Sequence, residues 1–251
     1  MNRHNLVVSI GAAVLVAGAA GYYLWQSRVA PSAPVSTATG PHIENPLAAM
    51  PNVPLPALAD SDDALTDELA TLFHTQGLSD LFYPTRLANR FVATVDNLPR
   101  EQVAATVRLL KPPAGAVAVR GTEPSLSLSP DNSARYSQYL KLLAAADTGQ
   151  AVGLYRKFYP LLQQAYDELG YPGHYFNDRV VEVIDNLLAT PDVADPVPLI
   201  HPSVMYKFAD PRIEARSAGQ KAMIRIGREN AAAVKAKLRE IRAQIATRPP
   251  A

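Results

Sequence analysis

The stretch GQAVGLYRKFYPLLQQAYDELGYPGHYFNDRVVEVIDNLLATP, residues 149–191, decides the fold. It contains two helical patterns joined by a Gly-Tyr-Pro-Gly turn at residues 170–173. In the first pattern an apolar or tyrosine residue recurs every three or four positions, which places one stripe along a helix. Tyrosine hydroxyls need hydrogen-bond partners, so we expect the stripe to be either a partly polar core or the wall of a binding groove. The stripe consists of Val152, Tyr155, Tyr159, Leu162, Tyr166 and Leu169.

The second helical pattern follows the turn. Asn177 can cap it, and Thr190 with Pro191 ends it. Pro160 lies inside the first pattern, where a missing N–H predicts a kinked helix. The second helix is predicted to bury Val180, Val181, Ile184, Leu187 and Leu188.

The flanking sequence indicates a mainly α fold. Helical patterns begin at Ser61, Pro84, Pro99, Ser133 and Asp210, and the last continues to about residue 246 with breaks at its two glycines. Alternating apolar residues within 114–130 and 192–208 predict one or two short β-hairpins. We therefore expect a multi-helix globular domain over residues 57–247, followed by a short tail at 248–251.

The run LVVSIGAAVLVAGAAGYYLW, from Leu6 to Trp25, contains no charged side chain. Twenty residues at about 1.5 Å each match a hydrocarbon layer about 30 Å thick, so we expect a single transmembrane helix at residues 6–25. The aromatic residues at its end suit the headgroup level, and residues 1–5 would form a cytoplasmic tip. A cleaved signal peptide is the alternative.

Residues 26–56 have the composition of a spacer. Prolines alternate with alanine, serine and threonine and almost no charge, so this segment offers too little apolar area to offset the entropy of ordering it. We expect it to hold the folded domain away from the bilayer.

The charges are balanced overall but not along the chain. The formal net charge is +1, which argues against a nucleic-acid partner. Residues 57–211 contain 19 acidic and 12 basic side chains (−7), whereas residues 212–248 contain 3 and 10 (+7). The chain has no cysteine, which excludes disulfides, thiolate metal ligands and a cysteine nucleophile.

Five blocks of the sequence are characteristic. They are FVATVDNLPR (91–100), NSARY (132–136), YPLLQQAYDELGY (159–171), VIDNLLATP (183–191) and YKFADPRIEARSAGQKA (206–222). In this order they resemble a family of bacterial proteins with a domain of unknown function, DUF3014, and the resemblance covers about residues 56–242. It implies a bacterial envelope protein with a membrane helix and a proline-rich linker, and it implies no activity or catalytic residue.

Aromatic and acidic residues around the central turn form a candidate ligand or partner surface. The tyrosines could line a sugar or peptide groove, with core packing as the alternative, and a carboxylate pair could perform acid/base work on a glycan, with a solvated helix face as the alternative. The candidate residues are Tyr155, Tyr159, Tyr166, Tyr171, His174, Tyr175, Asp178, Glu182 and Asp185.

A basic stripe follows near the end of the chain. It could attract anionic lipid headgroups or an acidic protein, but docking onto the acidic body of the same chain is favoured, because the two net charges are opposite and equal. The stripe consists of Arg225, Arg228, Lys235, Arg239 and Arg242.

No histidine pair has metal-ligand spacing and no glycine pattern resembles a phosphate loop, so we expect no metal, cofactor or nucleotide. The leading hypothesis is a single-pass inner-membrane protein, amino terminus cytoplasmic, whose periplasmic domain binds or scaffolds an envelope protein or glycan. The alternatives are an enzyme acting on peptidoglycan and a small-ligand-binding module.

Overall fold

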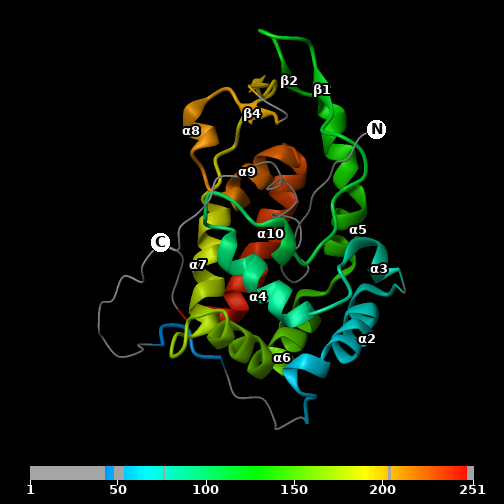
Figure 1. Ribbon diagram of the computed structural model, residues 1–251, viewed down its shortest axis with the longest axis vertical. Coiled ribbons are helices and arrows are strands. Elements are labelled where there is room, and N and C mark those ends of the chain that lie inside the picture. Colours follow the sequence, from blue (N-terminus) through cyan, green and yellow to red (C-terminus); the bar gives the residue numbers. More distant parts are fainter. Residues whose placement is uncertain (1–42, 48–53, 76, 203–204, 248–251) are drawn as a thin grey trace.

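The computed structural model describes residues 43–47, 54–75, 77–202 and 205–247, and these are mainly helical (Figure 1). The predicted transmembrane helix at residues 6–25 lies outside them, and none of the helices in the described part is long and apolar enough to span a bilayer. In chain order the α-helices are α2 (Asp62–Phe73), α3 (Leu78–Leu81), α4 (Leu87–Asn97), α5 (Ser137–Ala145), α6 (Thr148–Glu168), α7 (Phe176–Leu188), α8 (Pro211–Glu214), α9 (Ala218–Arg225) and α10 (Arg228–Ile245). Short 3-10 helices are η2 (Leu58–Asp60), η3 (Ala105–Val107) and η4 (Pro130–Tyr136).

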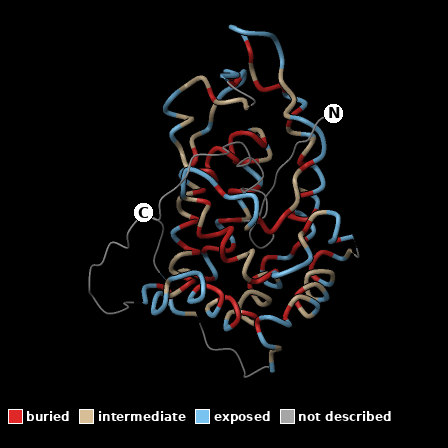
Figure 2. Tube along the Cα trace, in the orientation of Figure 1, coloured by how far each residue is buried: buried red, intermediate tan, exposed pale blue. Residues whose placement is uncertain are grey.

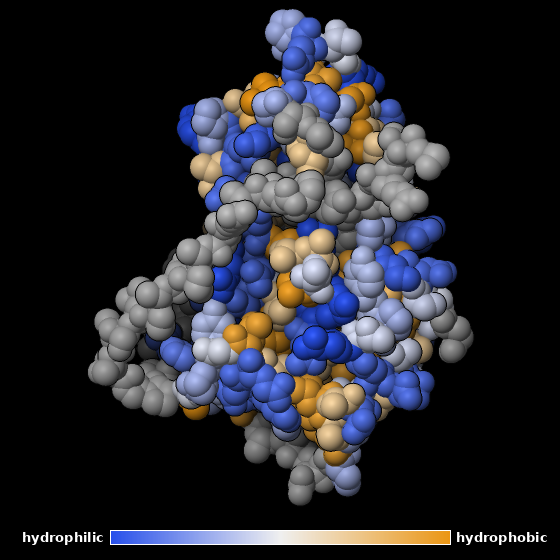
Figure 3. All heavy atoms as spheres, in the orientation of Figure 1, coloured by the Kyte–Doolittle hydropathy of each residue, from blue (hydrophilic) through white to orange (hydrophobic). Residues whose placement is uncertain are grey.

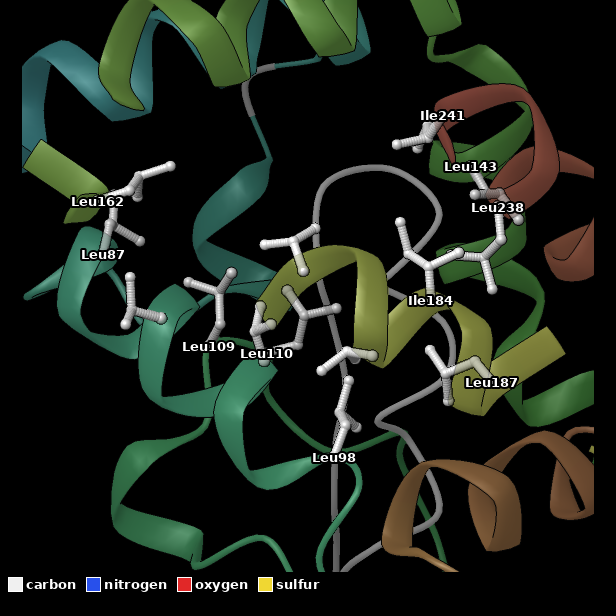
Figure 4. Close-up of a cluster of buried hydrophobic side chains, with 14 of the residues drawn as sticks. Leu87, Leu98, Leu109, Leu110, Leu143, Leu162, Ile184, Leu187, Leu238 and Ile241 are labelled. Atoms are coloured by element: carbon white, nitrogen blue, oxygen red, sulfur yellow. The ribbon is translucent and has the colours of Figure 1, made fainter. Parts of the chain in front are cut away.

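Helices α4, α6, α7 and α10 build the core. Helix α4 packs against α6 and α7, and α10 packs against the same two helices. In Figure 1, α4 lies in front of α7 and α10, and in Figure 2 the buried residues gather where these helices meet. Figure 4 shows the leucine and isoleucine side chains of this cluster converging from α4, α7 and α10. Fully buried members include Val92, Val95, Leu98, Val183, Ile184, Leu187, Val234 and Leu238.

Two short antiparallel strand pairs form a small lobe above α9 in Figure 1, which confirms the predicted hairpins. Strand β1 (Val119–Arg120) pairs with β2 (Ser127–Leu128), and β3 (Leu199–Ile200) pairs with β4 (Lys207–Phe208). A bridge between Ser127 and Pro198 joins the two pairs. The lobe has its own apolar cluster, separate from the helical core, made of Leu126, Leu128, Val197, Leu199, Phe208 and Ile224.

Helix α9 begins directly against the end of α4. The Gly219 backbone N–H donates to the Leu98 carbonyl at 2.9 Å, and the Ala218 N–H donates to the Arg100 carbonyl at 2.7 Å. A Cβ atom on Gly219 would lie 2.5 Å from Leu187 Cδ2. The glycine therefore allows the backbone of α9 to reach carbonyls at the end of α4.

The helix predicted from Pro99 is wrong. Only η3 forms there, because side chains of α4 hold the segment by lateral hydrogen bonds. Thr94 Oγ1 donates to the Val107 carbonyl at 3.1 Å and accepts the Leu109 N–H at 3.1 Å. Arg90 donates to the carbonyls of Thr106 and Arg108. These bonds use backbone groups that a helix would pair internally.

The last predicted helix is divided into α8, α9 and α10. Asp210 caps α8 through the Arg212 N–H, as its sequence predicts. The chain breaks before Ser217, which caps α9, and again at Gly227, which has a φ of 90°. Gly219, one of the two expected break points, lies inside α9.

Candidate functional site

The tyrosine stripe of α6 faces the interior. Val152, Leu162 and Tyr166 are buried, while Tyr155 and Tyr159 are half-buried and pack against the helical core. Of the six residues, only Leu169, at the end of the stripe, is exposed. The stripe therefore forms a partly polar core, which is one of the two roles predicted for it.

The hydroxyls of Tyr155 and Tyr159 in the stripe donate hydrogen bonds inside the protein. Tyr155 Oη donates to Asn177 Oδ1 at 3.0 Å, and Tyr159 Oη donates to Gln163 Oε1 at 2.9 Å. Burial raises the pKa of Tyr155, Tyr159 and Tyr166 above the ordinary tyrosine value. These hydroxyls stay protonated near neutral pH and act as hydrogen-bond donors.

Side chains of α6 cap the beginning of α7. Gln163 Oε1 accepts the Phe176 N–H at 2.9 Å, and Tyr159 Oη accepts the Asn177 N–H at 3.1 Å. The predicted cap at Asn177 is wrong, since the N-cap is Tyr175, two residues earlier, and the helix begins at Phe176. Asn177 is instead fully buried.

Asn177 joins three distant parts of the chain. Its Nδ2 donates to the Asn45 carbonyl at 2.7 Å and to the Ile245 carbonyl at 2.9 Å, and its Oδ1 accepts from Tyr155. A buried amide with all of these partners is a stable junction between α6, α7, the end of α10 and the segment around Asn45.

The segment Ile43 to Leu47, which its composition assigns to the spacer, lies against this junction. Asp178 Oδ1 accepts from Asn45 N at 2.7 Å and from Asn45 Nδ2 at 3.1 Å, and Asp178 Oδ2 accepts from Glu44 N at 3.1 Å. Leu47 N donates to Tyr175 Oη at 3.0 Å. We call this set of contacts the tether clasp.

Thr247 closes the tether clasp from the other end of the domain. Its N–H donates to Asn45 Oδ1 at 3.0 Å, and its hydroxyl donates to the Glu44 carbonyl at 2.6 Å. Asn45 is only 5% exposed as a result. The segment is thus held by hydrogen bonds around Asn45, and Leu47 also packs against the helical core.

The aromatic residues of the turn stack on one another. The rings of Tyr166 and Tyr171 lie 4.7 Å apart and nearly parallel, and Tyr166 also contacts Phe176 at 5.2 Å. His174 meets the edge of Tyr171 at 6.2 Å and is exposed. The turn is therefore packed against α6, with His174 at its outer side.

A buried charge network beside the turn was not predicted as a unit. Asp96, only 2% exposed, accepts from Arg100 Nη2 at 2.6 Å and from Arg179 Nε at 2.9 Å. Arg179 also donates to the Asp96 carbonyl at 2.7 Å, and Tyr171 Oη accepts from Arg100 at 2.6 Å. Asp96 and Arg100 are four residues apart, a spacing that favours pairing, whereas no local pattern pointed to Arg179, which comes from α7.

Arg179 remains charged in this network. Burial would lower the pKa of its guanidinium, but the hydrogen bond to Glu182 and the charge of Asp96 outweigh burial and raise that pKa. The network therefore stabilises the crossing of α4 and α7 through a charged pair.

Each of the three candidate carboxylates has a different partner within the chain. Asp178 holds the tether clasp, Glu182 accepts from Arg179 Nη1 at 2.6 Å, and Asp185 accepts from Arg242 Nε at 2.6 Å and Nη2 at 2.8 Å. In the described part of the chain, no cluster of three or more acidic or histidine side chains is arranged to hold a metal ion.

The basic stripe is divided between interior and surface. Arg225 lies 4.6 Å over the Phe208 ring, and Lys235 Nζ donates to the Thr190 carbonyl at 2.8 Å and to Asp192 at 2.9 Å. Together with Arg242 on Asp185, these are contacts within the same chain. Arg228 and Arg239 are exposed. Most of the stripe thus docks onto the body of the domain.

A groove of about 200 Å³ lies on the surface between α4 and α6. Its wall includes Arg86, Asn89, Glu168 and the exposed Leu169. On the face shown in Figure 3, apolar residues form separate patches among hydrophilic ones. The groove combines an apolar contact with charged edges, as protein interfaces commonly do.

Comparison with known proteins gives one family. The model of the family described as "Protein of unknown function (DUF3014)" matches residues 87–242, which is more than half of the 251-residue chain. The match begins at the first residue of α4 and includes α6, α7 and Asp178, but not residues 43–47. No curated protein and no solved structure matches the chain. The chain therefore belongs to the DUF3014 family.

Proposed function

We propose that the chain is a single-pass protein of the bacterial inner membrane whose helical domain lies in the periplasm and binds or scaffolds an envelope partner. The uncharged run at residues 6–25 and the proline-rich spacer support the anchor. The observation that carries the proposal is the tether clasp, in which Asn45, near the end of the spacer, is held by Asp178 and Thr247.

The tether clasp determines where the spacer leaves the domain. Asn45 and Glu44 are bonded to the start of α7 and to Thr247, two residues after α10, so the domain does not rotate freely about this end of the spacer. A fixed attachment point lets a tethered domain present the same face to its partner. This suits a scaffold better than a flexible linkage does.

We place the partner contact at the groove between α4 and α6. Leu169 supplies an exposed apolar contact, while Arg86 and Glu168 supply charges of both signs at its edge. A photo-reactive residue at Leu169 should give a discrete crosslinked product in living cells. The same residue at the equally exposed Ile200, in the strand lobe, is the control and should not give that product.

The topology has its own test. Alkaline phosphatase fused after Ala251 should be active, because it folds only outside the cytoplasm, and a cytoplasmic fluorescent reporter at the same place should be dark. An inactive phosphatase together with a bright reporter would overturn the periplasmic placement.

The alternative of a peptidoglycan-acting enzyme needs carboxylates that are free to exchange protons. Asp178 accepts three hydrogen bonds and Asp185 accepts two from Arg242, so both carboxylates are already engaged by partners within the chain. Release of soluble fragments from sacculi that is lost in Asp178→Asn, Glu182→Gln or Asp185→Asn would favour the enzyme.

A further inference from the structure

The helical core contains an apolar cavity of about 110 Å³ that is partly open to the surface. Helices α2, α4, α6, α7 and α10 all contribute side chains to its wall. Leu87, Leu109, Leu162 and Ile241, which Figure 4 labels, are among the lining residues. The cavity therefore lies at the meeting point of the helices that build the domain.

The wall of the cavity is suited to hydrocarbon groups. Among the described lining residues every side chain is aliphatic or aromatic, and the only polar side-chain group is the hydroxyl of Tyr155. That hydroxyl already donates to Asn177. A water molecule needs two to four polar partners, and a charged group would lose its hydration without compensation. An uncharged apolar occupant has neither cost.

The volume limits the size of the occupant. An apolar cavity of about 150 Å³ in another protein stays dry and binds benzene. The cavity here is somewhat smaller, at about 110 Å³, so it suits a group no larger than about one benzene ring. Leucine and phenylalanine side chains in the wall can adjust by small rotamer changes.

The cavity reaches the surface at some of its lining residues. Most of these residues are buried, but Leu69, Phe91, Ala151, Leu154 and Tyr155 are half-buried. The half-buried residues mark the side on which the cavity is accessible to a ligand.

We propose that this cavity binds an uncharged hydrocarbon group, supplied either by a small free molecule or by the end of an alkyl chain. The proposal is independent of the membrane anchor and of the groove between α4 and α6, because it rests on the cavity wall alone. A larger side chain that fills the cavity should exclude the ligand, so a single substitution can test the proposal.

The test is methyl NMR on the full-length chain in phospholipid nanodiscs, with two probes. Benzene represents a small free molecule, and palmitate carrying a nitroxide near its carboxylate, which leaves the methyl end free to enter, represents an alkyl chain. Benzene should shift the methyl signals of Leu65, Val180 and Ile241, which line the cavity. Methyls of Leu128 and Val197 in the separate strand lobe are the internal control and should not move.

Ala88→Leu fills the cavity, because Ala88 lies in its wall and is 2% exposed. This variant should lose the benzene-induced shifts, whereas Ala236→Leu, at an exposed position of α10, should keep them. If Ala88→Leu does not fold, Ala151→Leu at a half-buried lining position replaces it.

Each outcome decides the proposal. Shifts with benzene alone support a small free molecule, and additional broadening of the same methyls by labelled palmitate supports an alkyl chain. No perturbation of the cavity methyls by either probe overturns the proposal. Equal perturbation of the strand-lobe methyls, or benzene shifts that persist in the filled variant, overturns it as well.

Discussion

Asp178 Oδ1 accepts the backbone N–H of Asn45 at 2.7 Å, although 133 residues separate the two in the chain. The contact links a segment with the composition of a spacer to the first turn of α7. A carboxylate near the positive end of a helix dipole is well placed to accept such bonds. The spacer thus ends at a specific attachment point.

Asn45→Ala should open the tether clasp. The change removes the amide that donates to Asp178 and accepts from Thr247, and each lost bond costs about 0.5–1.5 kcal/mol. We expect the Leu47 and Glu44 amides, which remain bonded to Tyr175 and Asp178, to exchange with solvent roughly tenfold faster or more, measured by hydrogen exchange. Glu182→Gln is the control, because Glu182 is on α7 like Asp178 but lies outside the tether clasp. Equal exchange rates of these amides in both variants would contradict the role of Asn45.

Asp96→Ala should strongly destabilise the domain. It leaves the guanidinium of Arg179, 17% exposed, without its buried partner, and breaking such a pair costs about 3–5 kcal/mol. The free energy of unfolding from urea denaturation measures the loss. Glu182→Ala removes the exposed partner of the same arginine and should cost about 1 kcal/mol or less. Similar losses in the two variants would argue against a buried network.

Two glycine substitutions should change the stability of the domain in opposite directions. Gly219→Ala places a Cβ 2.5 Å from Leu187 Cδ2 and 3.2 Å from the Leu98 carbonyl, so it should destabilise the domain by about 1–3 kcal/mol. Gly153→Ala in α6 meets nothing within 4 Å and should stabilise the helix by about 0.5–1 kcal/mol. Thermal unfolding of both variants checks the pair. A Gly219→Ala domain as stable as the parent would show that α9 is not in close contact with α4 and α7.

Stability should fall at alkaline pH. Burial raises the pKa of Tyr155, Tyr159 and Tyr166 in the folded state, whereas in the unfolded chain they titrate near the ordinary value of about 10. The unfolded state therefore loses protons first, so the stabilisation is complete below about pH 10 and decreases as the pH rises towards the folded values. Midpoints of thermal unfolding should therefore stay level from about pH 8 to 9 and decrease above about pH 10, together with the appearance of tyrosinate absorbance. Tyr155→Phe should weaken this dependence, and an unchanged slope would exclude Tyr155 as a source.

Arg242→Ala should destabilise the domain more than Arg239→Ala. Arg242 is 7% exposed and donates two hydrogen bonds to Asp185, whereas Arg239 is exposed. Since Asp185 is itself partly exposed, we expect a loss of about 1–2 kcal/mol for Arg242→Ala and about zero for Arg239→Ala. Urea denaturation measures both. An equal loss at both positions would show that the basic stripe acts through its overall charge.

Periodic patterns made the central helices predictable. The repeats that start at Val152 and Val180 are long and regular, and they correspond to α6 and α7. The segment after Pro99 has a similar local pattern, yet Thr94 and Arg90 hold it as an irregular chain. Local periodicity cannot reveal hydrogen bonds that come from another helix.

The candidate site was predictable only in part. The sequence correctly indicated that the tyrosine hydroxyls need partners, but not that Asn177 and Gln163 supply them. Asn45 stands among prolines with no periodic signal, so its attachment to Asp178 could not be foreseen. The cavity depends on how five helices pack together, and a sequence pattern does not determine the volume left between them.

The bond between the Thr247 hydroxyl and the Glu44 carbonyl, 2.6 Å long, brings together positions 203 residues apart. The beginning and the end of the folded region are therefore neighbours in space. A circular permutant that joins them by a short glycine-serine segment and opens the chain at the exposed turn around Gly121 should retain the fold. For the same reason the whole domain could be inserted as a cassette into a surface loop of a host protein without stretching that loop.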